Sequence, residues 1–279
     1  MKKILYPILV VIAFLVMQCL AGIAVVVIAI IQRPELLANL KQTNDTGALM
    51  AAVGENAMGW AITISGIMTI AIIALLKMID WKTVLDFKMI DWKSGTLAIL
   101  GAVLSIFFLD IYEEILDLPN DMEDVFVSMS NSLIGALSIG IAGPIIEEFI
   151  FREGILGYML RSGINKWAAI TASALVFGII HLNPAQIPFA AGMGIILGII
   201  YYKTGNIVIP CILHILNNSV SVWMMYSMED AGKDFSLIEW MGGSTSAISS
   251  SILIGILGFT FLRLFWQQYK KSITYETVS

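Results

Sequence analysis

Charged residues are scarce in this sequence. Asp, Glu, Lys and Arg make up 13% of its 279 residues, whereas 58% are hydrophobic. A soluble domain has about a quarter charged residues, so this composition is typical of a membrane protein. There is no basic stripe, and the aromatic residues lie inside apolar runs, which argues against a nucleic-acid partner. We therefore expect an integral membrane protein whose surroundings are the lipid bilayer.

Cysteine is nearly absent as well. Cys19 and Cys211 lie in apolar runs outside any Cys-x-x-Cys pair, so the sequence predicts neither a disulfide framework nor a thiolate metal site. Lys2 and Lys3 precede an apolar run, as in a signal peptide. However, the run covers about 4–31, longer than the apolar part of such a peptide. We interpret it as a retained first membrane span.

Long apolar runs predict about eight transmembrane helices, since a helix needs about 20 apolar residues to cross the hydrocarbon core. The runs are 4–31, 58–79, 95–112, 132–158, 166–182, 185–202, 205–227 and 248–266. The fold class that follows is an all-α, polytopic membrane helix bundle. We expect one integral membrane domain over residues 1–279.

Basic residues gather in alternate connections between these spans. They are Lys2, Lys3, Lys77, Lys82, Lys88, Lys93, Arg161, Lys166, Lys203, Lys270 and Lys271, against Arg33, Lys41 and Lys233 in the other connections. The segment 113–124 contains acidic residues and no Lys or Arg. Cytoplasmic loops carry an excess of Lys and Arg. We therefore expect both termini in the cytoplasm and the protein in the cell membrane.

Two further patterns concern packing. The sequence KMIDWK occurs at 77–82 and again at 88–93. Its charges and tryptophans suit a segment at the cytoplasmic membrane interface, and a chance duplication in a loop is an equal alternative. In the sixth span, Ala190, Gly194 and Gly198 form a stripe of small residues, which permits close helix contact.

Ionisable side chains inside a span are costly and usually functional. The fourth span contains Glu147, Glu148 and Arg152. Glu148 and Arg152 are four residues apart on one helical face, so they can pair. Glu147 points about 100° away and is the candidate general base. Pro144 removes a backbone donor beside them. The alternative is an ion-pair network between helices.

Both histidines of the chain also fall within expected spans. His181 follows Phe177 by four residues, and Asn218 follows His214 by four, so each pair projects from one helical face. A polar group in apolar surroundings needs a partner. The simplest partners are one another and Glu147, which would make one polar cluster within the membrane.

Glu-Glu-x-x-x-Arg at 147–152, Phe-x-x-x-His at 177–181 and His-x-x-x-Asn at 214–218 resemble the three motifs of the CAAX prenyl protease and bacteriocin-processing family, also called Abi or CPBP. The resemblance covers about 128–227 and implies an intramembrane protease with a peptide or membrane-protein substrate. One departure is Glu153, because members commonly have Gly directly after the Arg.

The resemblance also implies roles. Glu147 would activate water, and His181 would help to hold it. His214 and Asn218 would donate to the oxyanion, and Glu148 with Arg152 would orient and brace the site. Glu147, His181 and His214 could instead bind zinc. A His-Glu-x-x-His motif is missing and Asn is a poor zinc ligand, so we expect a metal-free mechanism without a cofactor.

Two other functions remain open. A proton-coupled transporter would also carry intramembrane Glu and His, but no second copy of the motifs indicates an inverted repeat. A non-catalytic immunity or binding protein would keep the fold with decayed motifs, and here all motif residues are in place. A CAAX prenyl protein, a bacteriocin leader and a signalling peptide all remain candidate substrates.

The depth of the candidate site residues in the membrane is a further question. At about 1.5 Å per residue, Glu147 and His214 lie about 14–17 Å from the expected cytoplasmic ends of their spans, and His181 about 22 Å. Tilt or a later start of the fifth span would place the three side chains at one level. The side on which the site opens is not decided by these patterns.

Overall fold

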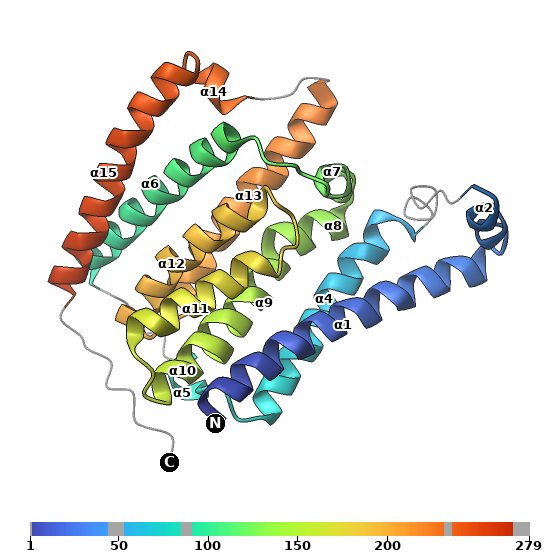
Figure 1. Cartoon of the computed structure of the whole chain (residues 1–279), viewed down its shortest axis with the longest axis horizontal. Helices are drawn as coiled ribbons and strands as arrows, with labels where there is room; N and C mark the ends of the chain where they lie inside the picture. Colours follow the sequence, from blue (N-terminus) through green and yellow to red (C-terminus); the bar gives the residue numbers. More distant parts are fainter. Residues whose placement is uncertain (1, 44–52, 85–90, 232–235, 270–279) are drawn as a thin grey trace.

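The computed structural model describes residues 2–43, 53–84, 91–231 and 236–269, and these ranges contain helices and no strand (Figure 1). Seven of the described helices are long and apolar enough to cross a membrane. They are α1 (Lys2–Gln32), α4 (Glu55–Leu75), α6 (Trp92–Leu116), the composite helix Leu133–Arg161, α12 (Gln186–Thr204), α13 (Val208–Ala231) and α15 (Ser244–Gln268). The expected all-α integral membrane bundle is confirmed.

The fifth expected span, 166–182, is shorter than the others. It forms α11 (Lys166–Ile179), whose 14 residues rise about 21 Å and fall short of the about 30 Å hydrocarbon core. The helix stops because Leu182 adopts a left-handed backbone (φ 53°) and Pro184 disfavours helix at the residue before it. The chain therefore turns early, and His181 lies in this turn rather than on the helix.

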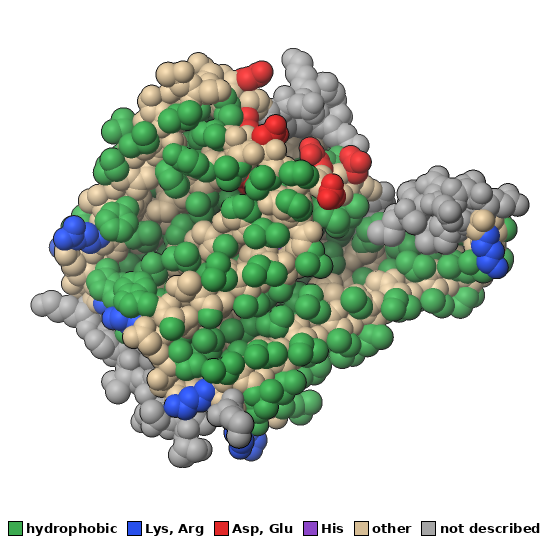
Figure 2. Space-filling view, viewed as in Figure 1, with side chains coloured by type: hydrophobic (Ala, Val, Ile, Leu, Met, Phe, Trp, Pro, Cys, Tyr) green, Lys and Arg blue, Asp and Glu red, His purple; other side chains and the backbone are tan. Residues whose placement is uncertain are grey.

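The bundle has a central group of helices with a pair on either side. The composite helix, α11, α12 and α13 form the centre, α1 packs on α4, and α15 packs on α6 (Figure 1). Apolar side chains cover the outer surface of the spans, as expected for a surface that faces lipid (Figure 2). All three motifs lie in the central group.

The first KMIDWK copy is anchored to the central group. Met78 and Ile79 are buried, and the backbone N–H of Asp80 donates to Glu153 Oε1 at 2.7 Å. Arg161 pairs with the same carboxylate oxygen at 2.8 Å and donates to the Met78 carbonyl. Glu153, which departs from the family pattern, thus fixes the connection after α4. Residues 88–90 of the second copy lie outside the described residues.

The small-residue stripe on α12 does bring two helices together. A Cβ on Gly194 would lie 3.0 Å from the Cα and Cβ of Ala174 on α11 and 3.3 Å from Phe177. The close approach of α11 and α12 therefore depends on glycine here, and it sets the position of the Phe177 ring in the site.

Gly194→Val should push α11 away from α12 and lower stability by about 1–3 kcal/mol, the usual cost of overpacking. The measurement is the melting temperature in detergent. Gly95→Ala on α6 is the matched control, because nothing lies within 4 Å of its added Cβ and alanine favours a helix. If Gly194→Val had the same melting temperature as the wild type, α11 and α12 would not be in the close contact described.

Candidate active site

The two glutamates lie in an irregular part of the fourth span. This composite helix runs through α8 (Leu133–Leu137), the π-helix η1 (Ser138–Ala142), α9 (Gly143–Glu148), the π-helix η2 (Phe149–Gly157) and α10 (Tyr158–Arg161). Glu147 and Glu148 end the short α9, between the two π-helical segments. Such segments alter which way side chains point and often occur at functional sites.

Pro144 explains why backbone carbonyls are free beside the glutamates. It has no N–H for the Gly140 carbonyl, the normal i−4 partner. The N–H of Gly143 bonds to Ser138 O, which leaves the Ile139 carbonyl without its helical donor as well. Side chains of α13 donate to these two carbonyls instead: Asn218 Nδ2 to Ile139 O and Ser219 Oγ to Gly140 O, both at 3.2 Å. The proline thus ties the fourth span to α13.

Glu148 is fully buried and has two partners. Its Oε2 lies 3.0 Å from Arg152 Nε, so the ion pair expected from the four-residue spacing is confirmed. Its Oε1 lies 2.8 Å from His214 Nδ1, a contact between residues 66 positions apart that no local pattern predicts. A buried carboxylate needs such partners, because an uncompensated charge in the interior is strongly unfavourable.

Phe177 connects the ion pair to both histidines. The Arg152 guanidinium lies over its ring, 4.6 Å from the centroid, in cation–π geometry. The two terminal nitrogens of Arg152 have no hydrogen-bond partner among the described residues, so the guanidinium is stabilised by this ring contact and by the ion pair with Glu148. The edges of Phe177 meet His181 and His214 at centroid distances of 5.0 Å and 5.8 Å. One aromatic ring therefore positions both imidazoles.

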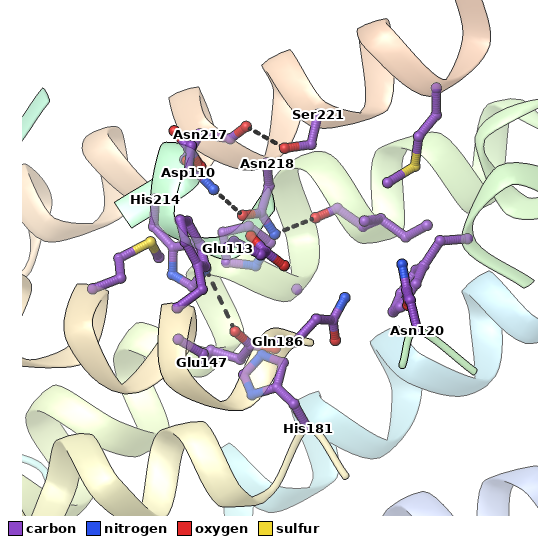
Figure 3. Close-up of a pocket in the computed structure, with 18 of the residues that line it drawn as sticks. Asp110, Glu113, Asn120, Glu147, His181, Gln186, His214, Asn217, Asn218 and Ser221 are labelled. Atoms are coloured by element: carbon purple, nitrogen blue, oxygen red, sulfur yellow. Dashed lines mark hydrogen bonds and ion pairs between the residues drawn. The ribbon is translucent and has the colours of Figure 1, made fainter. Parts of the chain in front are cut away.

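Glu147 points the other way, into a cavity. Its side chain is 23% exposed, and its Oε2 lies 3.6 Å from His214 Nε2. The ring of His214 is thus held from behind by Glu148 and faces Glu147 in front (Figure 3). Of the two adjacent carboxylates, one is buried with a cation and the other is available to a ligand.

His181 lies near Glu147, and both line the cavity (Figure 3). The fourth span continues to Arg161 rather than ending near 158, which brings the expected depth of Glu147 close to that of His181. His181 Nδ1 lies 2.7 Å from the Phe177 carbonyl. A carbonyl only accepts, so Nδ1 carries the proton and Nε2 is left for the cavity.

Asn218 also lines the cavity, one helical turn from His214. One N–H of its amide group serves Ile139 O, which leaves the other for a ligand. Its Oδ1 accepts from Asn217 Nδ2 at 3.2 Å, which fixes the amide orientation. Asn217 is therefore a site residue that the family motifs do not include.

The cavity has a volume of about 360 Å³ and brings together five of the expected site residues: Glu147, Phe177, His181, His214 and Asn218. Glu148 and Arg152 lie behind its wall. The cavity is also lined by polar residues that the sequence patterns did not indicate, among them Asp110, Glu113, Asn120, Glu123, Gln186, Asn217 and Ser221. Asp110 falls inside the expected third span, so the reasoning on ionisable residues in spans would have indicated it.

The described side chains hold no ready-made set of metal ligands. Among them, no group of three or more His, Cys, Asp or Glu residues is placed to hold a metal ion. Glu147 Oε2 and His214 Nε2 approach one another, and these two groups are fewer than the ligands that a zinc site needs. We therefore derive no step through a metal.

The architecture and the site define a polytopic helical membrane protein with a Glu/His/Asn cavity inside the bundle. Residues 129–220 match the model of the family described as type II CAAX prenyl endopeptidase Rce1-like. The resemblance inferred from the three motifs is therefore confirmed over this segment, which contains every motif residue.

Two curated proteins are similar to parts of the chain. The membrane-embedded CAAX protease MroQ of Staphylococcus aureus (strain USA300) is 32% identical over 125 residues, 43% of this chain and 50% of that protein. The putative membrane peptidase YdiL of Bacillus subtilis (strain 168) is 33% identical over 84 residues, 30% of this chain and 34% of that protein. The matched regions thus span half or less of these relatives. No solved structure matches the chain significantly.

Removing Arg152 tests the buried pair. Arg152→Ala would leave Glu148 with only His214, and breaking a truly buried pair costs about 3–5 kcal/mol. We expect a lower melting temperature in detergent and loss of activity. The double variant Glu148→Leu/Arg152→Leu removes both charges and should recover part of the stability, but not activity. Arg152→Ala with wild-type melting and turnover would show that the pair is incidental.

Proposed function

We propose that this protein is an intramembrane endopeptidase that hydrolyses a peptide bond with water activated by Glu147. One observation carries the proposal: Glu147 faces His214 across a polar cavity within the bundle, while the adjacent Glu148 is buried and paired. A carboxylate in a cavity beside two imidazoles and an amide is what acid–base hydrolysis of an amide requires. The match to the Rce1-like family model supports the same reaction class.

The proposed reaction assigns each group one task. Glu147 takes a proton from a water molecule that also contacts Nε2 of His181, and the oxygen attacks the carbonyl carbon of the substrate. The proton then passes from Glu147 to the leaving amine as the C–N bond breaks. A carboxylate can serve first as base and then as acid in this way, so the step needs no further reactant.

Two donors on α13 would stabilise the developing oxyanion. The imidazolium form of His214 donates from Nδ1 to Glu148 and from Nε2 into the cavity. Asn218 has a free N–H one helical turn away, in an orientation set by Asn217 and Ile139. Donors fixed before the reaction stabilise a transition state without reorganisation, which makes them effective in a site shielded from water.

The proposal also covers the class of substrate and the location of the protein. A peptide or a segment of a membrane protein is the substrate class, and a CAAX prenyl protein, a bacteriocin leader and a signalling peptide are the candidates. Lys and Arg in alternate connections favour a place in the cell membrane with both termini in the cytoplasm.

Substitutions in the cavity test the mechanism. Asn218→Ala should lower turnover by about 10²–10³, the usual effect of losing one oxyanion donor, while the protein still inserts and stays monodisperse. Glu147→Gln should abolish turnover because it keeps the shape and loses the base. The assay is mass spectrometry of a mixed peptide pool incubated with purified protein in liposomes.

Glu35→Gln is the matched control for Glu147→Gln, because it removes an exposed carboxylate that does not line the cavity. It should keep wild-type turnover. Asn218→Asp should fail, since a carboxylate repels the oxyanion. Full turnover in Glu147→Gln would refute the peptidase site built on Glu147. A wild-type protein that cleaves none of the peptides would favour the transporter or binding protein. Stoichiometric zinc lost together with activity in His181→Ala would refute the metal-free mechanism.

A further inference from the structure

The cavity that holds Glu147 has a rim at one end of the bundle. Asn120 and Glu123, which are exposed, belong to the rim, and Gln186 lies further in, beside His181 and Glu147 (Figure 3). The rim is held in place by two contacts between the connection after α6 and the turn after α11. Asn183 Nδ2 donates to Asn120 Oδ1 at 2.8 Å, and Ala185 N donates to the Pro119 carbonyl at 3.2 Å.

The polar lining indicates that this end opens to water rather than to lipid. Asp110 and Glu113 on α6 line the cavity on the way in, together with Glu123 of α7 (Glu123–Ser130). In the described part of the chain, the lining contains no Lys or Arg. Glu123 is exposed, and an ionised carboxylate at the membrane surface needs hydration, since its transfer to an apolar medium is strongly unfavourable. An aqueous opening at the α6–α7 connection provides it.

The opposite end of the cavity is closed. His214 and Phe177 form its floor and are 2% and 1% exposed. Behind them lie Arg152, Glu148 and Phe151, each at most 1% exposed. Among the described residues, this packed layer closes the far end of the bundle to Glu147, and the exposed part of the cavity lining lies at the α6–α7 end.

Acidic and basic residues lie mostly at opposite ends of the bundle. The basic residues Lys77, Lys93, Arg161, Lys166 and Lys203 belong to the connections at the closed end, whereas 113–124 at the open end has none. On the face shown in Figure 2, acidic side chains gather near α7 and α14 (Leu237–Trp240). Basic side chains lie at the other end, apart from those near α2 (Glu35–Thr43). By the excess of Lys and Arg on cytoplasmic loops, the closed end faces the cytoplasm.

We propose that the cavity opens only on the non-cytoplasmic face of the membrane. Its substrate is therefore a peptide segment already exposed on that face: a secreted peptide, or the extracytoplasmic stretch of a membrane protein beside its own span. This assignment of substrate class rests on the proposed peptidase function, whereas the direction of access does not. A cytoplasmic protein tail would have no path to Glu147.

Accessibility of single cysteines tests the proposal. In a Cys19→Ser/Cys211→Ala background, Asn120→Cys marks the rim, Gln186→Cys marks the interior, and Lys93→Cys marks the closed end, where it is exposed. Spheroplasts expressing each protein are treated with a membrane-impermeant maleimide before and after lysis. Asn120→Cys and Gln186→Cys should react fully in intact spheroplasts, and Lys93→Cys only after lysis.

Each other result overturns the proposal. If Gln186→Cys and Asn120→Cys react only after lysis and Lys93→Cys reacts before it, the orientation is reversed. If Gln186→Cys reacts from neither side while Asn120→Cys reacts, the cavity is closed to peptides. The labelling is independent of catalysis. The expected pattern in a protein that cleaves no peptide would thus refute the peptidase and leave the direction of access standing.

Discussion

The carboxylate of Glu148 organises the site. It is buried in the centre of the bundle, in an ion pair with Arg152 at 3.0 Å on one side and hydrogen-bonded to His214 at 2.8 Å on the other. A lone carboxylate in such a place would be very unfavourable, so both partners are held to it. Arg152 in turn lies over Phe177, whose ring edges meet both imidazoles. One buried charge therefore fixes three helices and leaves Glu147 as the member of the acidic pair that a substrate can reach.

Helix irregularity makes this arrangement compatible with a membrane. Pro144 and the π-helical segments leave carbonyls unpaired, and an unpaired carbonyl in hydrocarbon is costly. Asn218, Ser219 and Ser173 supply the missing donors from neighbouring helices, Ser173 to the Phe151 carbonyl at 2.9 Å. The groups that satisfy the backbone also join the fourth span to α11 and α13. The irregular backbone and the polar site thus depend on each other.

Local spacing predicts the parts of the site that lie on one helix. The Glu148–Arg152 pair, the His214–Asn218 face and the contact of Gly194 with α11 all follow from a period of 3.6 residues. Long-range features do not follow. The His214–Glu148 bond joins residues 66 apart, and the end of α11 before His181 depends on competition between apolar length and the turn at Leu182 and Pro184. Nothing in the motif departure at Glu153 indicates that this residue anchors the connection after α4.

The most direct test of the central claim is the ¹⁵N spectrum of the imidazoles in the purified protein. The chain has only two histidines, so each resonance can be assigned with one variant. If Glu148 holds His214, then Nδ1 of His214 carries a proton in a hydrogen bond, and this signal disappears in Glu148→Ala while that of His181 stays unchanged. A His214 signal that is identical in wild type and Glu148→Ala would contradict the claim that this buried carboxylate positions the site.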